Sequence, residues 1–132
     1  QGAVTNSYSS ANVNDSYAMA GGFAGDNPAS AGNSVSHSFS VGDVYSRTGT
    51  TTGSFSGHGS GSIVNSYWHN TPSNPSWGDT NSNTTAIADI DHPPYFSVTT
   101  NSPLNLWDFT TTWNICGSTG LPYLRALPAS CT

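Results

Sequence analysis

The chain contains no lysine and no glutamate, and only 7% of its 132 residues are charged. Seven aspartates, Arg47 and Arg125 give a formal net charge of −5, without an acidic block or a basic cluster. Nucleic acids and anionic membrane surfaces are bound by clustered cationic side chains, so we expect neither as a partner. No apolar run approaches the roughly 18 residues that a spanning helix requires, so we expect no membrane span.

Large aliphatic residues are also scarce, because hydrophobic residues make up 34% of the chain and many of them are Ala, Val or Tyr. This length suits one domain, and the composition favours a thin core over a three-layer one. Cys116 and Cys131 are the only cysteines, and their spacing is neither a redox nor a zinc motif. A disulfide that ties the C-terminal tail is favoured over two free thiols, and it implies an oxidising, extracellular setting.

One pattern occurs three times in the first 70 residues. It begins V-T-N-S-Y-S at Val4, V-S-H-S-F-S at Val35 and I-V-N-S-Y-W at Ile63, and a Gly-flanked phenylalanine follows in the first two copies. Tyr8, Phe39 and Tyr67 lie 31 and 28 positions apart, so we expect them to stack in one column. The residues predicted to form this repeat core are Val4, Tyr8, Val13, Phe23, Val35, Phe39, Val44, Phe55, Ile63 and Tyr67.

The repeat predicts strands and excludes most helix. Its apolar positions alternate with a period of two, and Gly, Ser, Thr and Asn interrupt every window that is long enough for a helix. A unit of about 30 residues with short strands and glycine corners is typical of a β-solenoid rung. We therefore predict an all-β fold with about two and a half rungs in residues 1–70.

These motifs resemble the GLUG repeats of bacterial secreted surface proteins and adhesins. The resemblance rests on the repeats quoted above, on Asn65-Ser66-Tyr67-Trp68, and on Trp107-Asp108-Phe109 and Gly120-Leu121-Pro122-Tyr123 near the end. It departs from the family at Phe23 and Phe55, where leucine is usual, and at His69. The resemblance implies a right-handed β-solenoid that serves as a stalk or adhesive surface, with no shared catalytic residue.

The last 60 residues differ from the repeats. Residues 71–103 are rich in Pro, Asn and Ser, and we expect a covering loop or edge strands there. Residues 104–132 are expected to form a disulfide-tied cap over one end of the solenoid, because unpaired strand edges at such an end need cover. The aromatic and apolar residues predicted for this cap are Trp107, Phe109, Trp113, Tyr123 and Leu124.

The opposite end begins inside a repeat, so we expect its face to be covered by copies of the chain or by the rest of a longer parent chain. The function predicted from these features is a non-catalytic extracellular structural or adhesive module, without a cofactor. A glycan-binding module is the alternative, with Trp77 as the candidate stacking residue, since an aromatic face matches a sugar ring. A polysaccharide-active enzyme and an ice-binding surface rank below it, because Asp15 and Asp43 do not align and Thr50–Thr52 form a run rather than a ladder.

Few side chains are candidates for modification or metal binding. Asn14 and Asn83 begin sequences that fit N-glycosylation. Asp79, Asn81 and Asn83 match the start of a calcium loop, but Thr84 and Ile90 stand where its Gly and Glu belong. A polar turn is the simpler interpretation of this segment.

Overall fold

The computed structural model describes residues 2–15, 20–28, 32–46, 52–59, 61–70, 84–88, 98–116 and 120–127. This part of the chain is all-β, as predicted, and its one helical element is the short 3-10 turn η4 (Leu104–Leu106). None of its helices has the length and apolar character needed to cross a membrane.

The strands fall into three repeats, which we name repeats 1, 2 and 3. Repeat 1 holds β1 (Ala3–Thr5), β2 (Tyr8–Ser9), β3 (Val13–Asp15), β4 (Ala20–Gly21) and β5 (Ala24–Asp26). Repeat 2 holds β6 (Ser34–Ser36), β7 (Phe39–Ser40), β8 (Val44–Ser46), β9 (Thr52–Gly53) and β10 (Ser56–His58). Repeat 3 holds β11 (Ser62–Val64) and β12 (Ser66–Asn70).

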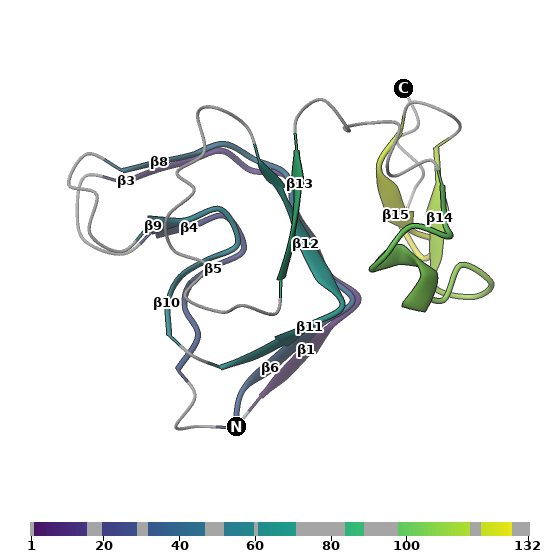
Figure 1. Cartoon of the computed structure of the whole chain (residues 1–132), viewed down its shortest axis with the longest axis horizontal. Helices are drawn as coiled ribbons and strands as arrows, with labels where there is room; N and C mark the ends of the chain where they lie inside the picture. The colour runs from purple at the N-terminus through teal and green to yellow at the C-terminus, as the bar shows by residue number, and fades with distance from the viewer. Residues whose placement is uncertain are drawn as a thin grey trace.

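Each strand pairs in parallel with its counterpart in the neighbouring repeat. Val4 pairs with Val35, and Val35 with Ile63, so β6 lies between β1 and β11. The same register joins β2 to β7 and β7 to β12, and it joins β3 to β8, β4 to β9 and β5 to β10. Figure 1 looks along the stack, so that the repeats overlie one another. One further strand, β13 (Thr84–Ala88), pairs in parallel with β12.

A left-handed residue turns the corner after the first strand of every repeat. Asn6, His37 and Asn65 have φ values of 50°, 49° and 50°. Asparagine and histidine enter this region more readily than most residues, which explains the residue types at the corner. The corner also interrupts the alternation of side chains. Residues an even number of positions apart therefore no longer face the same side when the corner lies between them.

The apolar residues consequently form two clusters, where the sequence led us to expect one column. The first holds Val35, Phe55, Ile63 and Trp68, with Phe23 against it. The rings of Phe23 and Phe55 stack in it with centroids 4.7 Å apart. This is the interior of the repeats.

The second cluster is the predicted column of Tyr8, Phe39 and Tyr67. Both ring pairs, Tyr8–Phe39 and Phe39–Tyr67, have centroids 5.1 Å apart and lie nearly parallel. The column does not belong to the interior, because Phe39 and Tyr67 pack with Leu104, Trp107 and Trp113 of the C-terminal segment. The stacking prediction is thus confirmed, and the prediction of a single core is wrong.

The C-terminal segment comprises η4, β14 (Trp113–Ile115) and β15 (Pro122–Leu124), and the two strands pair antiparallel. It stands beside the corner between β6 and β7 (Figure 1). The indole of Trp113 donates to Asn6 Oδ1 in repeat 1 at 3.2 Å, and that of Trp107 donates to the Asn65 carbonyl in repeat 3 at 2.7 Å. The segment therefore runs along the flank across all three repeats, which corrects the prediction of a cap over one end.

Serines fill the inner side of the corner. Ser38 is fully buried, its hydroxyl accepts from the backbone N–H of Ser7 at 3.2 Å, and its own N–H donates to the Ser66 hydroxyl at 3.2 Å. Each hydroxyl also donates to the carbonyl two residues earlier. This ladder satisfies backbone groups that the turn removes from strand pairing.

Candidate functional site

The five strands of repeat 1 form an open face of the described structure. Every one of them is the outermost strand of its sheet and pairs, within the described residues, only with repeat 2. Such strands present unpaired backbone groups along one edge. We call this surface the repeat 1 face.

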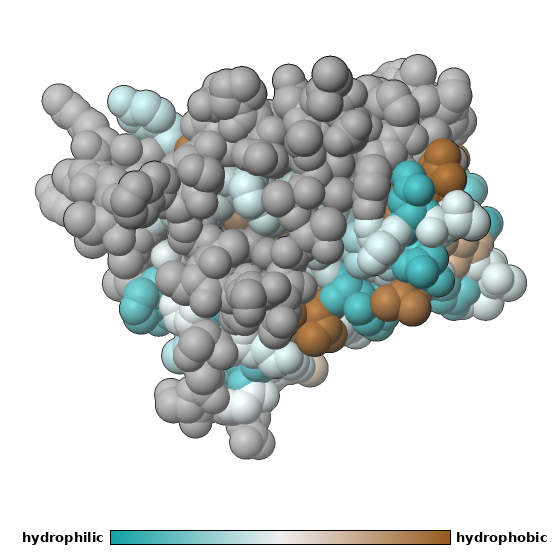
Figure 2. All heavy atoms as spheres, viewed as in Figure 1, coloured by the Kyte–Doolittle hydropathy of each residue, from teal (hydrophilic) through white to brown (hydrophobic). Residues whose placement is uncertain are grey.

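Residues at equal positions in the repeats show how open this face is. Val4 is 44% exposed whereas its partner Val35 is 5% exposed, and Tyr8 is 39% exposed whereas Phe39 is 1% exposed. Val4 and Tyr8 were predicted as repeat core and are in register, but nothing among the described residues lies over them. Other exposed apolar residues are scattered, and among the coloured atoms of Figure 2 the brown residues stand apart from one another.

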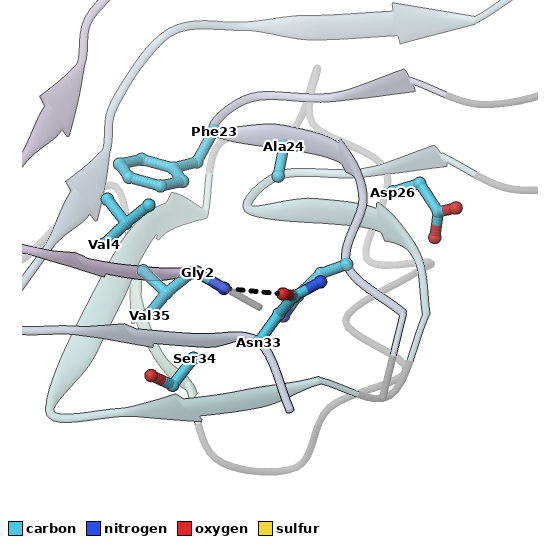
Figure 3. Close-up of a pocket in the computed structure, with 9 residues that line it drawn as sticks. Gly2, Val4, Phe23, Ala24, Asp26, Asn33, Ser34 and Val35 are labelled. Carbon is cyan, nitrogen blue, oxygen red and sulfur yellow. Dashed lines mark hydrogen bonds between the residues drawn. The ribbon is translucent and has the colours of Figure 1, made fainter. Parts of the chain in front are cut away.

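An open cavity of about 320 Å³ lies between repeat 1 and the start of repeat 2. Its lining residues come from β1, β5 and the start of repeat 2: Gly2, Val4, Phe23, Ala24, Asp26, Asn27, Asn33, Ser34 and Val35. Figure 3 shows Phe23, Val4 and Val35 on one side, and Asn33 on the other, where its side-chain oxygen accepts from the Gly2 N–H at 3.2 Å. Because Gly2 and Val4 are exposed and Val35 is buried, the mouth opens on the repeat 1 face.

Asn27 contributes to the lining, but its side-chain amide is buried against Gly61. It is 5% exposed, and within the described part of the chain its side-chain nitrogen has no hydrogen-bond partner. Its backbone is fixed, since its N–H donates to the His58 carbonyl and its carbonyl accepts from the Gly61 N–H. A buried amide without a partner costs free energy and calls for an explanation.

Asp26 and His58 link repeats 1 and 2 at the rim. Asp26 Oδ1 lies 3.1 Å from His58 Nδ1, and both side chains are about half exposed. Pairs this exposed contribute little to stability. The repeat predicted none of Asp26, Asn27 and Asn33 as site residues, because they have no counterpart in sequence at the same place in repeat 2.

The other candidates from sequence are dispersed or lie outside the described residues. Trp77, Asp79, Asn81, Asn83 and Cys131 fall outside them, so the calcium, stacking and second glycosylation predictions have no structural description. Cys116 is not a free thiol, and its pairing with Cys131 remains a prediction. Within the described ranges no three His, Cys or Asp side chains gather as a metal site.

The two aspartates considered for catalysis do not stack. Val13 pairs with Val44, and Asp15 pairs with Ser46. Asp15 therefore lies after the valine pair, whereas Asp43 lies before it. Asn14, the first glycosylation candidate, is exposed on β3. Trp68, Trp107 and Trp113 are 7% or less exposed and serve packing, which removes them as sugar-stacking surfaces.

No family model, curated protein or solved structure matches this chain. The function must therefore be inferred from the geometry of the repeats.

Among the carboxyl groups that the structure describes, that of Asp108 has a shifted pKa. Hydrogen bonds from the Thr111 side chain, the Thr111 and Thr110 N–H groups and the Thr112 hydroxyl lower the pKa of Asp108 from 3.8 to about 2. The two backbone donors lie 2.9 and 2.8 Å from Oδ1. They fix the turn that leads into Trp113.

We expect Asp108→Asn to lower the melting temperature at pH 6 and to lower it progressively less on acidification. The folded pKa is depressed, so the charged carboxylate stabilises the fold above about pH 4 and that contribution is lost as the pH falls toward 2. Thermal melts of both proteins from pH 6 to pH 2 measure the difference. A difference that stays constant over this range would contradict the assignment.

Proposed function

We propose that this chain is a non-catalytic structural or adhesive module of a secreted surface protein, built as a short right-handed β-solenoid that accepts a further coil on its repeat 1 face. The observation that carries the proposal is the contrast across that face. Val4 and Tyr8 are exposed, whereas the residues directly beneath them, Val35 and Phe39, are buried by the same kind of stacking.

A further coil of the same repeat is the occupant that fits best. Repeat 2 contacts repeat 1 through a valine, one aromatic ring of the column and a Gly-flanked phenylalanine. Repeat 1 carries the same kinds of residue at the equal positions. A coil in the same register would continue three kinds of contact at once: parallel pairing, ring stacking and apolar packing. Charge opposes this little, because the chain contains only nine Asp and Arg side chains in total.

The resemblance to GLUG repeats supports the same proposal, and so does the expected disulfide. Both favour an extracellular setting. The resemblance also favours a cell-surface location and a structural role over catalysis. The lack of alignment between Asp15 and Asp43 further weighs against a glycosidase, which needs two carboxyl groups facing one bond.

The proposal predicts that an added coil stabilises the chain. A second copy of residues 1–31, placed directly ahead of Gln1, keeps the spacing of 31 that separates repeats 1 and 2. Burying Val4 and Tyr8 beneath it is expected to raise the free energy of unfolding by roughly 3 kcal/mol, measured by urea denaturation.

Two matched variants test whether the new coil stacks as proposed. Val4→Asp, placed in the original repeat 1, should abolish the gain, because it puts a charge into an apolar contact. Val64→Asp is the control, since Val64 is 40% exposed and belongs to repeat 3. A tandem protein no more stable than the single chain, or equal effects of both variants, would overturn the proposal. Sedimentation of the single chain then reports whether separate copies supply the coil.

A further inference from the structure

We infer that the repeat 1 face is covered by a coil of the same polypeptide that runs parallel to repeat 1, and that the Ser7 hydroxyl fixes its register. This inference rests on the proposed function and deepens it, because it specifies the direction of the coil, its source and the residue that aligns it. Three features carry it: the direction of the serine ladder, the backbone groups at the open edge, and the burial of the opposite end of the repeats.

The serine ladder has one direction. The N–H of Ser7 donates to the Ser38 hydroxyl at 3.2 Å, and the N–H of Ser38 donates to the Ser66 hydroxyl at 3.2 Å. Each of these two hydroxyls therefore accepts from the repeat that precedes it in the sequence. The Ser7 hydroxyl donates to the Thr5 carbonyl at 3.1 Å, but it accepts from none of the described residues. Its unused lone pair suits the backbone N–H of one more coil.

The backbone groups at the open edge fit a coil that runs in the same direction. In repeat 2, the N–H groups of Ser34 and Phe39 donate to carbonyls of repeat 1 at 3.2 and 3.1 Å. Ala3 and Tyr8 lie at the equal positions in repeat 1, so their N–H groups point to the open side. A parallel coil places its carbonyls over both groups and its N–H over the Ser7 hydroxyl. A coil of opposite direction reverses the order of positions, so the ladder would end at Ser7.

The opposite end of the repeats is buried, which decides the source of the coil. In repeat 3, Ile63 and Tyr67 are fully buried. Val4 and Tyr8, at the equal positions of repeat 1, are 44% and 39% exposed. The far edge of β12 is already paired with β13.

Head-to-tail stacking of two intact copies is therefore disfavoured, because it would have to break the pairing of β12 with β13. A coil that is linked to repeat 1 through the chain docks at a high effective concentration, whereas a separate molecule must first lose its freedom of motion. The coil that fits the face best is thus part of the same polypeptide.

The corner places a requirement on the sequence of this coil. The corner residue is left-handed in all three repeats, with φ values of 49–50°, so we expect asparagine, histidine or glycine there. The next residue supplies the N–H for Ser7, which excludes proline from that position. A β-branched residue two positions before the corner and an aromatic residue two positions after it would complete the contacts of Val4 and Tyr8.

The test compares Ser7→Ala in the single chain and in the tandem protein that carries a second copy of residues 1–31 ahead of Gln1. The substitution is made in the original repeat 1. In the single chain the hydroxyl makes one exposed bond, so the equilibrium constant of unfolding should rise less than about threefold in urea denaturation. In the tandem protein a buried N–H loses its acceptor, so the constant should rise about tenfold or more. That N–H belongs to the second residue 7, in the added coil, and should exchange with solvent at least about tenfold faster.

Ser9→Ala is the matched control. Ser9 pairs with Ser40, whose hydroxyl is buried without a hydrogen-bond partner among the described residues. Cover by a further coil therefore gives the Ser9 hydroxyl no partner either, and its removal should destabilise neither protein.

The results distinguish this inference from the proposed function. A tandem protein no more stable than the single chain would overturn both. A stabilised tandem protein in which Ser7→Ala costs no more than in the single chain would overturn the role of Ser7 alone. Sedimentation of the single chain between about 5 and 200 µM should show a monomer. Self-association that Val4→Asp abolishes would instead show that separate copies cover the face, and would overturn the assignment of the coil to the same polypeptide.

Discussion

Replacing Trp113 with alanine is expected to lower the free energy of unfolding by about 3–5 kcal/mol, the largest effect of any single substitution in the C-terminal segment. Trp113 is fully buried, its ring lies 5.9 Å from Phe39 and 4.7 Å from Trp107, and its indole N–H bonds to Asn6. Truncation opens a cavity at the seam between this segment and the repeats. For a chain of this size, the melting temperature should fall by at least about 10 °C.

Two further variants separate the causes. Trp113→Phe keeps most of the packing and removes the bond to Asn6, so it should cost about 1–2 kcal/mol. Leu106→Ala is the control, because Leu106 is 57% exposed on the same segment and should change stability by less than about 0.5 kcal/mol. If Trp113→Ala were no more damaging than Leu106→Ala, the segment would not be fixed to the repeats through this contact.

Phe55→Ala is expected to destabilise the chain by about 3–5 kcal/mol, and Phe23→Ala by roughly half as much. The two residues occupy equal positions in adjacent repeats and stack on each other, but Phe55 is fully buried and Phe23 only partly. Removal of the Phe55 ring abolishes packing contacts on both of its faces, whereas removal of the Phe23 ring abolishes them mainly on one face.

Urea unfolding of the two variants at low protein concentration measures this difference. Equal losses would show that Phe23 is covered on both sides in solution, contrary to the open repeat 1 face. A loss for Phe23→Ala that grows with protein concentration would instead point to copies that cover the face of one another.

Sequence spacing predicted the stacking of the repeats because parallel strands place equal positions over one another. The distances of 31 and 28 residues between Tyr8, Phe39 and Tyr67 translate directly into rings 5.1 Å apart. Alternation within a strand also held: Ile63 is buried between the exposed Ser62 and Val64.

The side on which each ring lies was not predicted, because alternation assumes an unbroken strand. Asn6, His37 and Asn65 share one repeat position and adopt left-handed conformations. They exchange the sides that the following side chains face. Two asparagines at that position were an available signal. The placement of Trp107 and Trp113 had no such signal, because composition shows that aromatic rings need cover and not which surface they cover.

The cavity was also beyond sequence reasoning. It depends on Asn27 and Asn33, which lie on either side of a repeat boundary and come together only when β5 and β6 are in place. Neither residue belongs to the repeated pattern, so self-alignment of the chain passes over both.

Stacking in register also determines how such a chain converts residues into length. Each unit of about 30 residues advances the axis by only one strand spacing, near 4.8 Å, so a rod 100 Å long would consume about 20 units and roughly 600 residues. A single helix reaches the same distance with about 70 residues. What the wide cross-section provides in exchange is resistance to bending, since any deflection must compress a ladder of backbone hydrogen bonds on one side and stretch it on the other.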